Sequence, residues 1–503
     1  MPGPRSLLLI TVDCLRADHV GFLGYDRPTT PFLDSLAAEG VVFSNAIVAG
    51  APTYYSFPAI LASRHPLALG RDVLGLAPGE PTIATVLEES GYATAAFLAA
   101  NPYLSRRFGY HAGFGTFRDF LDAEIESTAV PGNGAGSAGL RTRLNRGLAE
   151  VCHKLGSVGS LYDELYFQYC QRVAASPAPS FDTLRRYPAA DVIVDHACDW
   201  LARVGELPFF LWLHLMDPHS PYYPPQEALR LMGRGDISAG RARYLNSYWN
   251  RGDLGANRFR RHREDVIALY DAGIRWVDTQ VARLIDTLRQ SRLWDNCVFA
   301  FTADHGEEFL DHGGRYHPPS RVTEELVRVP LLLRMPGPSQ TGTVKTPFSM
   351  IRLAPTLLEA AGAPVPSSFS GRSFESRLHS AEGDGEAAIV ECITDCANLF
   401  RASGRLGRRI IAVREQRYKL VFDFGLPREQ VFDLADDPGE FHPLSADTDK
   451  PVRRRLLERL RQHLSDSRKD GDAERRLRAL LQEIRLETAA TAACESNLVK
   501  TQS

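Results

Sequence analysis

The chain has 503 residues and a formal net charge of −3, so it can bury a large core and shows no basic excess for binding nucleic acid. No apolar stretch approaches the length of a membrane span, and the apolar run near Met1 is too short for a signal peptide. The eight cysteines are scattered, without the paired spacing of a structural zinc site. We therefore predict a cytoplasmic enzyme with reduced thiols that binds neither nucleic acid nor membranes.

Five segments share one pattern, a continuous apolar run that ends at polar residues. Runs that are apolar on both faces are typical of buried parallel strands. They are LLLITV before Asp13, ATAAFLA before Asn101, FFLWLHLM before Asp217, VFAFTA before Asp304 and VPLLL before Arg334. Helical stretches such as TIATVLEESG and VIALYDAGIRWVDTQVARLIDTLRQS lie between them. This alternation predicts an α/β fold with a doubly wound, mainly parallel sheet flanked by helices.

The pattern changes at two places along the chain. Residues 122–187 lack strand patterning and contain VPGNGAGSAG, so we expect an insertion of helices and loops within a catalytic domain at residues 1–375. Further on, AAIVECIT, RRIIAVREQ and RYKLVFDF are predicted to be short strands, followed by a helix near residues 452–464. They predict a smaller α+β subdomain with an antiparallel sheet at residues 376–484. We expect residues 485–503 to be a disordered tail.

Three of the predicted strands end in residues that bind metals or transfer protons: LLLITV at Asp13, VFAFTA at Asp304 and His305, and FFLWLHLM near His214 and His219. Ligands bind at the carboxyl ends of the strands in an open α/β sheet. Two carboxylates and an imidazole suit one divalent ion, Mn, Mg, Zn or Ca, without choosing among them. A single aspartate after a strand is commonly a turn or a cap. Three such strands predict a catalytic metal site.

The segment AGAPTYYSFPAILASRHP, residues 49–66, carries two candidate nucleophiles, Thr53 and Ser56. Ser56 followed by Pro58 is typical of a helix start, so Ser56 is predicted to be a helix cap. Thr53 lies just before that helix, where free N–H groups and the helix dipole favour phosphate or sulfate. Arg64 either contacts substrate charge or caps the same helix. The aromatic residues around Thr53 either line an aryl pocket or, as we expect, pack in the core.

Four motifs together resemble the sulfatase-like branch of the alkaline phosphatase superfamily. They are LLLITVDCLRADHVGFLGYDRPTTPFLDSLAAEGVVFSNA, PTYYSFPAILASRHP, FFLWLHLMDPHSPYYPP and FTADHGEEFLDHGGRYHPPSRVTEELVRVPLLLRMPG. The resemblance implies an alkaline phosphatase-like fold and one metal ion held by four residues, Asp13, Asp304, His305 and the nucleophile Thr53. It also implies that His219 and His317 stabilise charge and protonate the leaving group.

Several neighbouring residues have weaker assignments. His214 is a candidate substrate-binding residue, together with Arg64, and His312 is expected to be a packing histidine. Glu307 and Asp311 either orient His305 or lie exposed in solvent.

Two positions differ from the family pattern. Sulfatases make a formylglycine from Cys or Ser in C/S-x-P-x-R, whereas this chain has Thr53 followed by Tyr-Tyr-Ser-Phe57. Threonine cannot form that aldehyde, but it is the nucleophile in related phosphodiesterases, phosphonate hydrolases and phosphoethanolamine-type transferases. Cys14 replaces the second family aspartate and is either a soft metal ligand or, as we expect, a buried thiol.

These features predict a metal-dependent hydrolase or transferase of small anionic sulfate or phosphate esters, with phosphodiesters or phosphonates favoured. Thr53 attacks phosphorus or sulfur to form a covalent intermediate, and His219 or His317 acts as the acid. Two alternatives stay open, a sulfatase that works without formylglycine and a degenerate relative that only binds an anion. The sequence also leaves open the substrate and whether the chain forms a homo-oligomer.

Overall fold

The main sheet contains nine strands in the part of the chain that the structure describes. This computed structural model describes residues 3–121, 157–169, 180–205, 207–337, 341–378, 383–394, 399–401, 404–426, 429–445 and 450–469. The strands are β1 (Ser6–Val12), β2 (Val41–Ile47), β3 (Ala93–Leu98), β4 (Thr116–Arg118), β5 (Phe209–Leu215), β6 (Cys297–Ala303), β9 (Arg328–Arg334), β10 (Gly342–Val344) and β11 (Phe348–Ser349). Their order is β10-β2-β9-β6-β1-β5-β3-β4, with β11 paired to β2.

The sheet is mixed and mainly parallel, which confirms the predicted fold class. β1 lies between β5 and β6 and is parallel to both, and all seven of its residues are buried. β9, the VPLLL run, is instead antiparallel to both β6 and β2. A strand buried on both faces is apolar throughout whichever way it runs, so its direction was not readable from the sequence.

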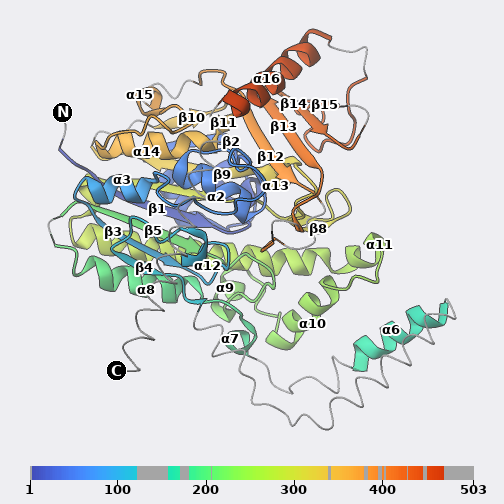
Figure 1. Ribbon diagram of the computed structural model, residues 1–503. Helices are drawn as coiled ribbons and strands as arrows, with labels where there is room; N and C mark the ends of the chain where they lie inside the picture. The colour runs from blue at the N-terminus through green and yellow to red at the C-terminus, as the bar shows by residue number, and fades with distance from the viewer. Residues whose placement is uncertain are drawn as a thin grey trace, which may run out of the picture.

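Helices cover both faces of the sheet (Figure 1). One layer contains α1 (Pro31–Ala37), α8 (Ala190–Leu201), α9 (Gln226–Leu231) and the long α12 (Arg263–Gln290). The other contains α2 (Thr53–Ala62), α3 (Ile83–Glu89) and α14 (Leu353–Ala361). The remaining α-helices of the described chain before the C-terminal sheet are α6 (Ser157–Tyr169), α7 (Phe181–Leu184), α10 (Ala239–Trp249), α11 (Ala256–Phe259), α13 (Glu324–Val327) and α15 (Glu375–Leu378). None of the helices described here is both long enough and apolar enough to span a bilayer.

A close backbone contact fixes the loop after β5 against α12. A Cβ atom added at Gly273 would lie 2.5 Å from the backbone oxygen of Asp217, so only glycine permits this approach. The contact holds the turn that leads to His219 at the carboxyl edge of the sheet.

The C-terminal part forms a second, antiparallel sheet, as predicted. It contains β12 (Ala388–Ile393), β13 (Arg409–Glu415), β14 (Tyr418–Asp423) and β15 (Gln430–Asp433), and α16 (Lys450–Lys469) packs on β13 and β14 (Figure 1). Along β13 alternate residues face opposite sides: Ile410 and Ala412 join the main core, whereas Ile411 and Val413 pack toward α16. The small sheet therefore lies between the main core and α16.

The predicted domain boundaries stay predictions. Of the predicted insertion at residues 122–187, the described parts are α6 and the segment that begins at residue 180. The predicted tail, residues 485–503, lies outside the described residues.

Candidate active site and metal centre

The sheet brings the ends of three strands to one edge. In β1, Val12 is in register with Leu215 of β5 and with Ala303 of β6. Three segments therefore leave the sheet at the same edge. They are Asp13, the loop that leads to His219, and the Asp304–His305 pair. The backbone N–H of Asp13 also donates to the carbonyl of Leu215 at 2.8 Å, which holds this edge together.

Four of the predicted site residues meet around one ring nitrogen. His305 Nε2 lies 3.2 Å from Thr53 Oγ1, 3.5 Å from Asp304 Oδ2 and 3.6 Å from Asp13 Oδ1. Both carboxylates and the imidazole are completely buried, and Thr53 is 5% exposed. The structure thus gathers the predicted metal ligands and the predicted nucleophile into one cluster.

The hydrogen bonds of His305 and Asp304 leave their inward atoms free to accept a cation. His305 Nδ1 lies 2.8 Å from the carbonyl of Gly306, which can only accept, so Nδ1 carries the proton and Nε2 presents a lone pair. Asp304 Oδ1 accepts the backbone N–H groups of His305 and Cys14, at 2.9 and 3.3 Å. Asp304 Oδ2 is buried and has no hydrogen-bond partner among the described residues. This donor set fits a divalent cation.

The pKa shifts in the cluster also favour a bound divalent cation. Burial raises the pKa of Asp304 to about 8, and the charge of Asp13 adds to that rise. Burial lowers the pKa of His305 to about 4, so the ring is neutral and can bind a metal. Burial alone would raise the pKa of Asp13, but His219 and His214 hold it well below its ordinary value. A bound cation would stabilise two buried carboxylates that otherwise repel each other.

Thr53 is the first residue of α2, and Ser56 is not the helix cap that the sequence suggested. The helix starts three residues earlier, because the N–H groups of Tyr55 and Ser56 already bond to the carbonyl of Pro52. Ser56 lies inside the helix, where its hydroxyl donates to the carbonyl of Thr53 at 3.1 Å. Pro58 is also inside the helix. Thr53 therefore sits in the first turn, where N–H groups have no partner within the helix.

Asn101 is a member of the site that the sequence analysis missed. It follows β3, and its Nδ2 donates to Asp13 Oδ2 at 2.8 Å. Its Oδ1 accepts the N–H of Tyr103 at 3.0 Å, which fixes the orientation of the amide. The signal was present, since an apolar run ends just before Asn101, but the sequence does not reveal that β3 lies two strands from β1.

His214 contacts the same carboxylate from β5. Its Nε2 lies 3.3 Å from Asp13 Oδ2, and its Nδ1 lies 3.0 Å from the hydroxyl of Thr11. The side chain is completely buried. The structure therefore places His214, the predicted substrate-binding histidine, against the carboxylate of Asp13, a predicted metal ligand.

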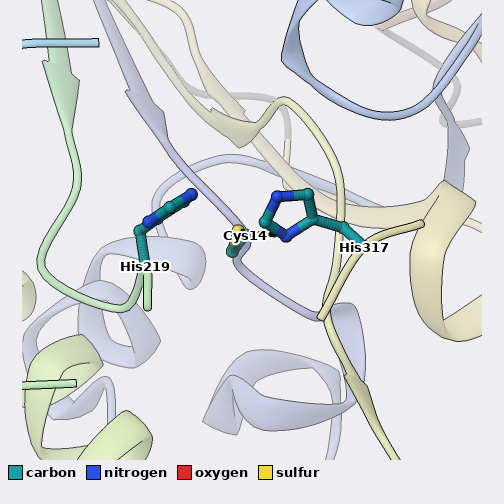
Figure 2. Close-up of side chains that lie close together, drawn as sticks. All are labelled: Cys14, His219 and His317. Atoms are coloured by element: carbon teal, nitrogen blue, oxygen red, sulfur yellow. Dashed lines mark hydrogen bonds between the residues drawn. The ribbon is translucent and has the colours of Figure 1, made fainter. Parts of the chain in front are cut away.

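Cys14, His219 and His317 form a second group beside the first (Figure 2). Cys14 Sγ lies 3.1 Å from Asp13 Oδ1 and 3.3 Å from His317 Nδ1, and the two histidine rings are 5.2 Å apart. One donor atom from each residue lies within 4.8 Å of the others, so Cys14 stays a candidate soft ligand. Burial raises the pKa of Cys14, which agrees with a buried thiol.

Glu307 contacts His317, and the pKa values of His317 and His219 shift in opposite directions. Glu307 is completely buried, and its Oε2 lies 3.2 Å from His317 Nδ1. Burial opposes a charge on His317, but Glu307, together with Asp13 and Asp304, outweighs it and raises the pKa of that ring. Burial lowers the pKa of His219. Neighbouring groups whose pKa values move apart are typical of acid–base sites.

Other residues singled out from the sequence lie around this cluster. Arg64 pairs with Glu80, and its Nη2 donates to the carbonyl of Gly75 at 2.8 Å, so its side chain does not cap α2. Its predicted role in substrate binding stays a prediction.

Asp311 accepts a hydrogen bond from Arg16 at 2.8 Å, and His312 Nδ1 lies 2.8 Å from Glu325 Oε1. The aromatic neighbours of Thr53 are buried, which confirms the expected packing role; they are Tyr54, Tyr55 and Phe57.

Comparison with known proteins gives a consistent family. The sulfatase family profile matches residues 5–363, and the profile of the C-terminal part of N-sulphoglucosamine sulphohydrolase matches residues 315–470. An arylsulfatase of Clostridium perfringens is 24% identical over 464 residues, which cover 86% of this chain and 89% of that protein.

Two solved structures show the same fold. The phosphonate monoester hydrolase of Silicibacter pomeroyi superposes with a TM-score of 0.65 at 21% identity. The aligned residues cover 93% of this chain and 96% of the hydrolase chain. The phosphonate monoester hydrolase of Agrobacterium radiobacter gives a TM-score of 0.64 at the same identity and the same coverage.

Proposed function

The chain belongs to the sulfatase family of ester hydrolases, and from that premise we propose that it cleaves a small phosphate or sulfate ester with Thr53 as the nucleophile. The observation that carries the proposal is the position of Thr53 Oγ1, 3.2 Å from His305 Nε2 at the start of α2. The hydroxyl is thereby held beside the carboxylates of Asp13 and Asp304 and next to helix N–H groups that favour an anion.

Asp13, Asp304, His305 and Thr53 are the residues that would hold the metal ion. A divalent ion bound there would act as a Lewis acid on a substrate oxygen and favour ionisation of a neighbouring hydroxyl. The protein contributes the orientation of these groups. Asn101 and His214 fix one oxygen of Asp13, and backbone N–H groups fix one oxygen of Asp304.

The reaction then follows from the positions of Thr53 and the two histidines. Thr53, ionised by loss of its hydroxyl proton to solvent, forms a bond from Oγ1 to phosphorus or sulfur, and the bond from that centre to the leaving alcohol breaks. His317, kept protonated by Glu307 at 3.2 Å, gives a proton to the departing alcohol oxygen. Water then attacks the central atom of the threonine ester, the bond from that atom to Thr53 Oγ1 breaks and restores the ionised Thr53, and the proton that the water loses returns to His317. His219, on the facing loop, contacts the carbonyl of Ser220 through Nδ1, so it would donate a hydrogen bond from Nε2 to the developing oxyanion in its protonated form.

Threonine at the nucleophile position favours a phosphorus centre over sulfur. An ester of Thr53 has no adjacent hydroxyl through which it could be released by elimination, so a second attack at the central atom is required. We therefore favour phosphodiesters or phosphonate esters as substrates. Hydrolysis of a sulfate ester without formylglycine is the alternative, and it uses the same residues.

The test compares Thr53→Ala with Thr53→Ser and with Ser56→Ala as the matched control. The substrates are a bis-aryl phosphate, an aryl phosphonate and an aryl sulfate, each with the metal-loaded full chain. We expect Thr53→Ala to lower kcat by about 1,000-fold or more with nearly unchanged metal content, and Thr53→Ser and Ser56→Ala to keep most of the activity. Mass spectrometry of a quenched reaction should find the adduct on Thr53.

Three results would count against the proposal. Full activity of Thr53→Ala would remove Thr53 from the mechanism. Faster turnover of the aryl sulfate than of both phosphorus esters would favour the sulfatase alternative. A wild-type protein that binds metal and phosphate but turns over none of the three esters would favour the degenerate, anion-binding alternative.

A further inference from the structure

A second group of metal-binding side chains lies outside the catalytic cluster. It consists of His65, just after α2, Glu391 in β12 and His463 on α16. One donor atom from each residue lies within 4.8 Å of the others. The three residues come from distant parts of the chain, so the fold itself brings them together.

The hydrogen bonding of this group is incomplete. His463 Nε2 lies 2.8 Å from Glu391 Oε1, and the backbone N–H of Leu67 donates to Oε2 at 3.1 Å. The third member has no such contact: His65 Nδ1 is buried and has no hydrogen-bond partner among the described residues. Buried polar atoms in native proteins normally have a partner, so an unpaired ring nitrogen beside a carboxylate indicates a missing ligand.

The charges around His65, Glu391 and His463 determine which kind of ligand can bind there. The side chain of Glu391 is 1% exposed and pairs with Arg409, the first residue of the adjacent strand β13. Burial and the neighbouring His463 lower the pKa of His65 to about 3, so that ring is neutral and keeps a lone pair. The two rings are 4.6 Å apart at an angle of 69°, edge to face rather than stacked. A carboxylate and two imidazoles are therefore available within reach of one ion.

We propose that His65, Glu391 and His463 form a second metal site, which takes a zinc-like cation of intermediate softness. Two imidazoles and one carboxylate are typical zinc ligands, and water supplies the fourth position. On binding, the cation replaces the proton between His463 and Glu391, which is released to solvent, while Arg409 keeps its contact with Glu391 Oε1. The proposal does not depend on the proposed function.

The site would join the catalytic part of the chain to the C-terminal sheet. His65 follows the helix that begins at Thr53, whereas Glu391 and His463 belong to the C-terminal sheet and the helix that covers it. A cation at this position would add a link between α2 and α16. Its primary effect is therefore on stability and on the docking of the C-terminal part.

The experiment measures zinc binding with the catalytic cluster disabled. The full-length Asp304→Asn variant is stripped with a chelator and dialysed against Zn²⁺, and bound zinc is measured by elemental analysis. We expect about one equivalent of zinc and a higher Tm in its presence. Replacing His463 by Ala in that background should reduce the bound zinc to background and abolish the shift in Tm. His65→Ala in the same background should give the same result.

The matched control is His442→Ala, because His442 is an exposed histidine outside the group. It should leave zinc content and Tm unchanged. The absence of bound zinc in the Asp304→Asn protein, or equal zinc content with and without His463, would overturn the proposal. Folding of each variant is checked by its Tm without zinc, and Co²⁺ absorption in the visible range provides a second readout of histidine ligation. These measurements need no substrate, so they are independent of whether Thr53 is the nucleophile.

Discussion

Asn101 and Asp13 are joined by a 2.8 Å hydrogen bond although their strands, β3 and β1, are separated by β5. His214 of the intervening β5 contacts the same oxygen of Asp13, at 3.3 Å. Asp13 Oδ2 is therefore held from two neighbouring strands, whereas Oδ1 lies 3.6 Å from His305 Nε2 and accepts a hydrogen bond from Cys14 at 3.1 Å.

Removing this hydrogen bond should weaken the metal site. For Asn101→Ala we expect metal affinity and kcat/KM to fall about 10- to 100-fold, because the freed carboxylate loses its fixed orientation. Titration of activity with Mn²⁺ or Zn²⁺ measures the effect. Asn45→Ala is the control, since the Asn45 side chain bonds to the carbonyl of Lys345 on the edge of the sheet. Equal metal affinity in both variants would contradict a role for Asn101.

The proposed proton donor can be tested through the leaving group. His317→Asn should lower kcat by about 100- to 10,000-fold on esters of alkyl alcohols, which need a proton to depart. The loss on 4-nitrophenyl esters should be much smaller, because nitrophenolate leaves without one. His312→Asn serves as the control, since His312 contacts Glu325. The same loss on both kinds of ester would show that His317 does not protonate the leaving group.

Substitutions at Cys14 separate its two interpretations. As a buried thiol that donates to Asp13 Oδ1 at 3.1 Å, Cys14 is replaceable by Ser without loss of metal, and we expect unchanged zinc content in Cys14→Ser. Cys14→Asp should instead raise the affinity for Mg²⁺ or Ca²⁺ relative to Zn²⁺, because it adds a hard oxygen ligand. Competition between metals, followed by elemental analysis, measures both effects. A loss of zinc in Cys14→Ser would identify the sulfur as a ligand.

Lys419 should be important for docking the C-terminal sheet. Its side chain is completely buried and contacts Glu324 of α13 at 3.0 Å and Glu440 at 2.8 Å. We expect Lys419→Met to lower the free energy of unfolding by about 3–5 kcal/mol, because the buried Glu440 and the part-buried Glu324 lose this cationic partner. Denaturant unfolding measures the change, and the exposed Lys345→Met should stay within about 0.5 kcal/mol of wild type.

The pH dependence of this effect has a definite sign. Burial alone would lower the pKa of Lys419, but Glu440 and Glu324 raise it above its ordinary value of 10.5. A group whose pKa is raised on folding stabilises the native state fully below its unfolded pKa, and loses that contribution as the pH rises beyond it. The difference between wild type and Lys419→Met should therefore be constant from pH 7 to 9 and shrink only above about pH 10.5. A difference that already shrinks between pH 7 and 9 would contradict the ion-pair explanation.

The apolar runs predicted the central strands because strands buried on both faces leave an uninterrupted pattern. The run in β2 was missed, since Ser44 and Asn45 interrupt it where the pairing with β9 shifts register. The direction of β9 was not predictable either, because burial on both faces looks the same in either direction.

Some residues of the site were also predictable from local sequence, whereas the role of others depends on the tertiary arrangement of the strands. Asp13, Asp304 and His305 were predicted from strand ends, and the structure brings them together. Asn101 ends a strand in the same way, but its role depends on which strands are neighbours. The start of α2 at Thr53 was hidden by Ser56 and Pro58, whose local preferences for a helix start are overridden by the hydrogen bonds to Pro52.

The position of β1 at the centre of the sheet has a consequence for biosynthesis. β1 precedes both of its partners in the chain: it pairs with Phe209–Leu215 on one side and with Cys297–Ala303 on the other. A nascent chain on the ribosome therefore exposes this apolar strand until its second neighbour has emerged, and such strands are prone to aggregation. Productive synthesis should depend on a chaperone that shields this strand during translation.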